Sequence, residues 1–135
     1  MNQDAKKLLQ RYFDAFNAGK PREMLDCLAD NVVHDVNQGE RRSGKAKFAE
    51  FLAHMDRCYQ EQLKDIVLMS NAEGTRGAAE FTVHGMYKAD DEGLPPARGQ
   101  TYVLPAGSFF TVSHGKISRV TTYYNLKSWI EQVGG

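Results

Sequence analysis

The chain has 135 residues, a length typical of one domain that folds without help from a metal or a disulfide. Its 17 basic and 17 acidic residues leave no formal net charge, so no overall field favours nucleic acid, an anionic membrane or a polyacidic partner. Cys27 and Cys58 have neither the spacing of a metal or redox motif nor the number of a disulfide scaffold. No stretch resembles a signal peptide or a membrane span. We therefore expect one soluble, cytoplasmic domain over residues 1–135.

The first part of the chain predicts helices, because apolar residues recur there at intervals of three and four. Helices are expected over residues 4–18, 21–28 and 44–59. Gly19 is placed to end the first helix, Pro21 to begin the second, and Ser43 to cap the third. Residues 32–36 are expected as a short strand and residues 37–43 as a polar loop.

The rest of the chain predicts strands joined by turns. Strands are expected over residues 63–71, 77–89, 100–112 and 116–124, with a short amphipathic helix over 126–133. Helices followed by hairpin-linked strands indicate an α+β domain with a segregated sheet. We expect a cone-shaped α+β barrel, in which three N-terminal helices pack in a strongly curved, mostly antiparallel sheet. The open end of such a cone is a reasonable place for an enclosed, mostly apolar pocket.

Three blocks of the sequence together resemble a known family. They are RYFDAFNAGKPREMLDCLADNVVHDV, GERRSGKAKFAEFL and FFTVSHGKISRVTTYYNLKSW. In this order they are similar to the ketosteroid isomerase and SnoaL-like polyketide cyclase branch of the nuclear transport factor 2-like superfamily. The resemblance covers nearly the whole chain and implies the cone-shaped fold, which hosts many chemistries and binding roles.

The resemblance also implies two catalytic residues. Tyr12 occupies the place of the tyrosine that helps to form the oxyanion hole in ketosteroid isomerases. Asp35 occupies the place of the general base at the end of the first strand. The late-strand aspartate of those isomerases has no counterpart in residues 104–110, which removes part of the electrostatic stabilisation that their sites use.

The residues themselves leave two interpretations of each catalytic candidate open. If strand alternation holds, Asp35 shares a face with Val33 and lies opposite His34. An acid on an apolar face would be desolvated, and its pKa would rise toward the range of a general base. The alternative is a solvent-facing carboxylate in a turn. Tyr12 lies on the apolar stripe of the first helix, where packing alone is the alternative to oxyanion stabilisation.

The remaining candidates are expected to line a pocket for a small hydrophobic molecule. These substrate-binding candidates are Phe16, Leu52, His54, Tyr102, Phe110 and Trp129. Core or interface packing is the alternative for the aromatic members. No histidine shows the spacing of a metal site, so we expect neither a metal nor a cofactor.

Two classes of function fit these residues. The first is a cofactor-free proton-transfer enzyme, an isomerase or cyclase, with Asp35 as general base and Tyr12 as donor to the enolate oxygen. The alternative is a noncatalytic domain that binds a hydrophobic ligand or serves dimerisation. Epoxide hydrolysis is a third and weaker candidate function, because Glu80 and Arg98 are the nearest residue types to the charged set that this reaction needs. We expect a homodimer through the outer face of the sheet, near His84 and Tyr123.

Overall fold

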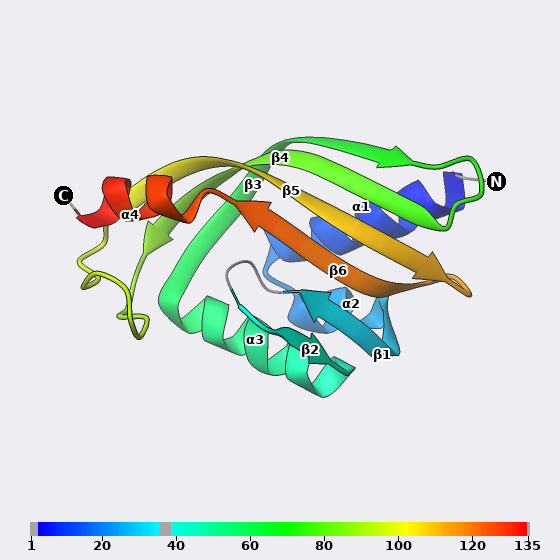
Figure 1. The fold of residues 1–135 in the computed structure, drawn as a ribbon, viewed down its shortest axis with the longest axis horizontal. Coiled ribbons are helices and arrows are strands. Elements are labelled where there is room, and N and C mark those ends of the chain that lie inside the picture. The colour runs from blue at the N-terminus through cyan, green and yellow to red at the C-terminus, as the bar shows by residue number, and fades with distance from the viewer. Residues whose placement is uncertain (1–2, 36–38, 135) are drawn as a thin grey trace.

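A curved sheet of six strands and four helices make up the computed structural model over its described residues, 3–35 and 39–134 (Figure 1). The helices are α1 (Gln3–Ala18), α2 (Pro21–Asp26), α3 (Lys45–Cys58) and α4 (Leu126–Gly134). The strands are β1 (Leu28–Asp35), β2 (Arg41–Ser43), β3 (Tyr59–Ser70), β4 (Arg76–Tyr87), β5 (Thr101–Ser113) and β6 (Lys116–Tyr124). None of the helices in these ranges is long and apolar enough to cross a bilayer.

The strand order is β2-β1-β6-β5-β4-β3. All neighbouring pairs are antiparallel except β1 and β6, which run parallel. Figure 1 shows the long strands β3 to β6 arching over α1, with α3 beside the short pair β1 and β2. The predicted α+β class and the curved, mostly antiparallel sheet are therefore confirmed.

Helix α1 fills the concave face of the sheet with the apolar stripe that its sequence predicts. Leu8, Leu9 and Phe13 are almost fully buried, and each contributes roughly 1.5–3 kcal/mol through removal from water. The helix approaches β4 closely at Gly77, where a Cβ atom would lie 2.6 Å from Cδ1 of Leu9. A glycine at this position lets the helix reach the sheet.

Three local predictions differ from the structure between β1 and α3. Strand β1 begins at Leu28, earlier than predicted, and Val36, which was expected to end it, lies outside the described residues. The predicted loop contains strand β2, whose exposed polar residues pair with β1 at the edge of the sheet. The N-cap of α3 is Gly44 with a φ of 97° and no side-chain cap, so the prediction of Ser43 as the cap is wrong.

The junction of α3 and β3 positions the candidate site. Helix α3 ends at Cys58, and the extended backbone of Tyr59 starts β3 with no intervening loop. Strand β3 was expected only from residue 63. Because it starts at Tyr59, its first residues lie at the end of the sheet where β4 ends, β5 begins and α4 packs on β5 (Figure 1).

Candidate functional site

Strand β1 places His34, and not Asp35, on the inner face of the sheet. His34 pairs with Val120 of β6, and Val120 is buried in the core. Val32 and His34 are 0% and 5% exposed, whereas Val33 and Asp35 are only partly buried. The predicted alternation is correct, but the face that it assigns to the interior is wrong.

Asp35 is held on the outer face by an ion pair and a hydroxyl. Arg41 Nε lies 2.7 Å from its Oδ1 and Arg41 Nη2 lies 3.2 Å from its Oδ2. Thr121 donates from Oγ1 to Oδ2 at 2.7 Å. The Arg41 and Thr121 hydrogen bonds lower the pKa of Asp35 below its ordinary value. These hydrogen bonds outweigh the desolvation, which acts to raise the pKa, so this carboxylate is a weaker base than the sequence suggested.

Tyr12 lies in the core and does not face Asp35. Its ring packs edge-on against Phe13 and Phe110, with centroids 5.4 and 5.7 Å away. Burial raises the pKa of its hydroxyl far above the usual value, and the Cys27 thiol raises it further. Cys27 directly precedes β1, whereas Asp35 ends that strand. The predicted carboxylate–phenol pair is therefore not formed by these two residues.

His34 is a buried titratable group for which the sequence predicted no role. Its ring lies 4.5 Å from that of Phe48 and 4.6 Å from that of Phe51, and its Nδ1 has no hydrogen-bond partner. Burial, with the nearby charge of Arg42, lowers the pKa of His34 to about 4. The imidazole is therefore neutral at neutral pH.

A carboxylate–phenol pair does occur on the inner face, between Glu61 of β3 and Tyr102 of β5. The Tyr102 hydroxyl donates to Glu61 Oε2 at 2.5 Å. The two side chains meet across β4, because Gly85 pairs with both residues. A Cβ atom at position 85 would collide with the phenol ring of Tyr102. Gly85 thus provides the space in which Tyr102 reaches Glu61.

Desolvation dominates the electrostatics of this pair. Burial raises the pKa of the Glu61 carboxyl, although the hydrogen bond from Tyr102 acts in the opposite direction. Burial and the charge of Glu61 raise the pKa of the Tyr102 phenol well above its ordinary value. Glu61 remains partly exposed and Tyr102 is 3% exposed. The carboxyl is thus shifted toward the pKa of a useful general base while the phenol stays protonated.

Tyr102 packs against Trp129, which in turn contacts Tyr59 and Tyr87. Trp129 of α4 lies 5.9 Å from Tyr102, 5.1 Å from Tyr87 and 6.0 Å from Tyr59, measured between ring centroids. Tyr59 and Tyr87 stack on each other at 5.4 Å. Tyr102 and Trp129, both candidates for substrate binding, therefore lie side by side, and the contacts among the rings are packing contacts.

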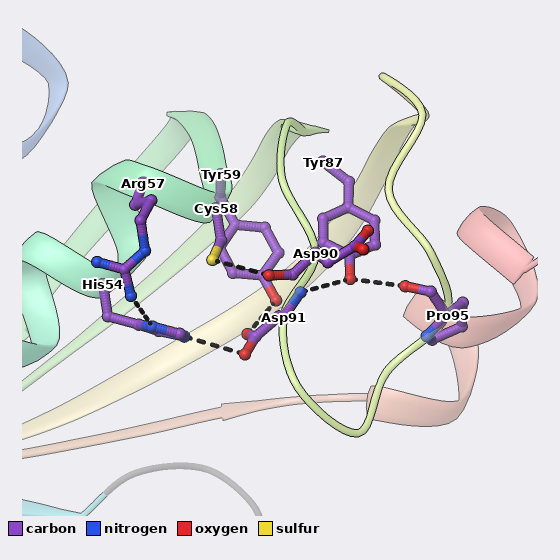
Figure 2. Close-up of polar contacts among 8 residues, drawn as sticks. All are labelled: His54, Arg57, Cys58, Tyr59, Tyr87, Asp90, Asp91 and Pro95. Carbon is purple, nitrogen blue, oxygen red and sulfur yellow. Dashed lines mark hydrogen bonds and ion pairs between the residues drawn. The ribbon is translucent and has the colours of Figure 1, made fainter.

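His54 lies at the rim of this region, on a network that Figure 2 shows. Its Nε2 lies 3.0 Å from Asp91 Oδ1, and Arg57 contacts its Nδ1 at 3.0 Å. Tyr59 donates to Asp91 Oδ2 at 2.6 Å. Donor atoms of His54, Cys58 and Asp91 lie within 4.8 Å of one another, which makes them a candidate metal-binding group among the described residues.

The other predicted pocket residues lie elsewhere in the core. Phe16 and Leu52 are partly buried against it, and Phe110 is fully buried beside Tyr12. Two hollows on the surface of the described residues are open to solvent. The larger, about 600 Å³, lies along Tyr124–Glu131 at α4, and the other, about 390 Å³, lies between α1 and α2. Neither is the enclosed apolar pocket that we expected.

The sequence contains a signal for Glu61 that the predicted strand boundaries leave out. Tyr59, Glu61 and Leu63 alternate with Gln60 and Gln62, which is the pattern of a strand with one acid on its apolar face. Because β3 was expected to start at residue 63, this acid fell into an unassigned gap.

The expected homodimer would form through the outer face of the sheet, and it stays a prediction. Val103, Phe109 and Tyr123 are 50%, 46% and 58% exposed there. These apolar side chains are of the kind that a subunit interface uses.

Comparisons with known proteins agree with this fold. The family model of the SnoaL-like domain matches residues 9–120. A proposed polyketide cyclase from Pseudomonas putida KT2440 is 62% identical, with 96% of this chain and 97% of that chain covered and a TM-score of 0.95. A second, from Xanthomonas campestris pv. campestris, is 56% identical, with 98% of both chains covered and a TM-score of 0.95.

A nuclear transport factor 2-like protein from Burkholderia xenovorans LB400 shares the fold at 14% identity, with a TM-score of 0.78 over 97% of this chain and 96% of that one. No curated protein matches the chain. The match of the family model over most of the chain, together with these close relatives, shows that the protein belongs to the SnoaL-like domain family.

Proposed function

We propose that the chain is a cofactor-free proton-transfer enzyme, a cyclase or isomerase, that acts on a small hydrophobic carbonyl compound. The observation that carries the proposal is the hydrogen bond between Glu61 and Tyr102 on the inner face of the sheet. A desolvated carboxylate beside a phenol donor is the minimal apparatus for forming and stabilising an enolate. The related proteins named as proposed polyketide cyclases support the same reaction class.

In the proposed reaction, Glu61 removes a proton from the carbon next to the substrate carbonyl, and Tyr102 donates a hydrogen bond to the enolate oxygen. Tyr102 gives its hydrogen bond to Glu61 in the free protein. When the substrate oxygen takes over that bond, Glu61 Oε2 is freed to accept the proton. In an isomerisation Glu61 returns the proton to another carbon. In a cyclisation the enolate carbon attacks a second carbonyl, whose π bond breaks, and the resulting alkoxide takes the proton from Glu61.

Asp35 and Tyr12 have a smaller part in this proposal than the family resemblance suggested. Asp35 is ion-paired to Arg41 on the outer face, and Tyr12 is enclosed by aromatic rings. We propose that Tyr12 and Phe110 support the floor of the inner face. Trp129, whose ring packs edge-on against that of Tyr102 at 5.9 Å, holds the phenol in place.

Glu61→Gln tests the proposal with a panel of β,γ-enones and dienones. Turnover is followed by absorbance of the conjugated product and by deuterium uptake at the acidic carbon. We expect Glu61→Gln to lower kcat/KM by roughly 10²–10⁴, the usual worth of a general base, and Tyr102→Phe to lower it by roughly 10²–10³. Because Gln keeps the size of Glu, the variant should fold as the parent does.

The same experiment separates an enzyme from a binding domain. If no compound of the panel is turned over, and the parent and Glu61→Gln bind these compounds equally well, the noncatalytic alternative replaces the proposal. If turnover occurs but survives in Glu61→Gln, another residue is the base.

A further inference from the structure

A histidine, a cysteine and an aspartate meet at the rim of the sheet, outside the Glu61–Tyr102 pair. His54 and Cys58 are four residues apart on α3, so both project from one side of the helix. Asp91 follows β4 and faces them from the loop that leads to β5 (Figure 2). One donor atom from each lies within 4.8 Å of the other two.

We propose that His54, Cys58 and Asp91 bind a zinc ion. An imidazole nitrogen, a thiolate sulfur and a carboxylate oxygen form a donor set that zinc accepts, whereas magnesium and calcium require oxygen ligands. The thiolate and the carboxylate supply two negative charges, which balance the charge of the ion. A water molecule completes the tetrahedron, and the partly exposed His54 leaves that position open to solvent.

The free protein already holds two of the three ligands in place. His54 Nε2 and Asp91 Oδ1 are 3.0 Å apart, and the ion replaces the proton that now lies between them. Tetrahedral zinc holds such donors about 3.3–3.7 Å apart. Cys58 Sγ has only a weak hydrogen bond to give up, to the Asp90 carbonyl at 3.6 Å. Side-chain adjustments of about 1 Å therefore suffice to form the site.

A second layer of hydrogen bonds orients Asp91. Tyr59 donates to its Oδ2 at 2.6 Å, which leaves Oδ1 for the ion. The backbone N–H of Asp91 donates to the Tyr87 hydroxyl at 2.9 Å, and that hydroxyl donates to the Pro95 carbonyl at 2.6 Å. Partners of this kind fix ligand orientation in metal sites. Binding of the ion would join this loop to α3.

Arg57 opposes metal binding in the free protein. An arginine can only donate hydrogen bonds, so its contact to His54 Nδ1 at 3.0 Å leaves the ring proton on Nε2, where the ion must bind. When zinc occupies Nε2, the proton moves to Nδ1 and the exposed Arg57 side chain turns away. Zinc binding does not depend on the proposed reaction, because none of the ligands belongs to the Glu61–Tyr102 pair.

Titration of the full chain with zinc, followed by calorimetry, tests the site. We expect one ion per chain and the release of one proton, from the Cys58 thiol. Cobalt in place of zinc should give thiolate-to-metal charge-transfer absorption. His54→Gln and Cys58→Ser should each weaken binding by at least about tenfold, and Tyr59→Phe by about tenfold or more. Arg57→Gln should tighten it severalfold.

The matched controls are Cys27→Ser and His114→Gln, which change a buried cysteine and an exposed histidine outside the cluster. Both should bind zinc as the parent does. The proposal is overturned if the parent binds no zinc, if His54→Gln binds as tightly as the parent, or if the cobalt form lacks the thiolate band. If Cys58→Ser does not fold, His54→Gln and Arg57→Gln decide the matter, since both change partly or fully exposed side chains.

Discussion

Two carboxylates on opposite faces of one sheet have opposite chemical characters. Asp35, on the outer face of β1, accepts hydrogen bonds from Arg41 and Thr121, and these lower its pKa. Glu61, on the inner face of β3, accepts a hydrogen bond from the Tyr102 phenol, and burial raises its pKa. The face and the partners, and not the residue type, decide whether the pKa of an acid is raised or lowered.

His34 and Asp35 sharpen this comparison, because they are neighbours on β1 that face opposite ways. Burial lowers the pKa of His34 from 6.5 to about 4, so between these values the unfolded chain binds the proton and the folded chain does not. The stability that the neutral, buried His34 side chain contributes is therefore complete above pH 6.5 and is lost as the pH falls toward 4. The expected loss of unfolding free energy is on the order of 3 kcal/mol.

Urea unfolding at about pH 7.5, 5.5 and 4.5 would measure this loss of unfolding free energy, because these pH values span the titration of His34. His34→Leu should flatten the dependence of stability on pH in this range, whereas the exposed His114→Gln should leave it unchanged. The ion pair of Asp35 adds a further loss only at lower pH, because its folded pKa is depressed. An equal slope in His34→Leu and the parent would contradict the placement of His34.

Gly85→Ala would break the inner carboxylate–phenol pair without touching either partner. Its Cβ atom would collide with the ring of Tyr102, and overpacking of this kind costs about 1–3 kcal/mol. We expect a lower midpoint in urea and a loss of turnover similar to that of Tyr102→Phe. The control is Gly107→Ala, where a Cβ atom would lie 3.5 Å from the Ala79 carbonyl, an ordinary contact. If both variants lose the same stability, the crowding at Tyr102 is not the cause.

The sequence predicts the helices and the sheet well, because their apolar patterns repeat over many residues. It predicts the site less well, because single residues decide the site. Alternation correctly put His34 and Asp35 on opposite faces, but the polar contacts of Asp35 with Arg41 and Thr121 come from β2 and β6. The approach of Tyr102 to Glu61 depends on a glycine in the strand between them. Contacts between distant strands of this kind leave no local pattern.

Asp35→Asn should have the smallest effect of these changes, although the family resemblance points to this residue as the base. The Asp35 side chain is 27% exposed and that of Arg41 is 62% exposed, and water screens such surface ion pairs, so they contribute little to stability. Asn keeps an oxygen that can accept the Thr121 hydroxyl, so the strand pairing survives.

We expect kcat/KM of Asp35→Asn within about threefold of the parent, far from the loss of roughly 10²–10⁴ expected of a general base. Parallel rates for Asp35→Asn and Glu61→Gln on one substrate measure the difference directly. A large loss in Asp35→Asn with an unchanged urea midpoint would return the role of base to Asp35. That outcome would require the β1 carboxylate to leave Arg41 when substrate binds, and it would make the ion pair a resting state of the enzyme.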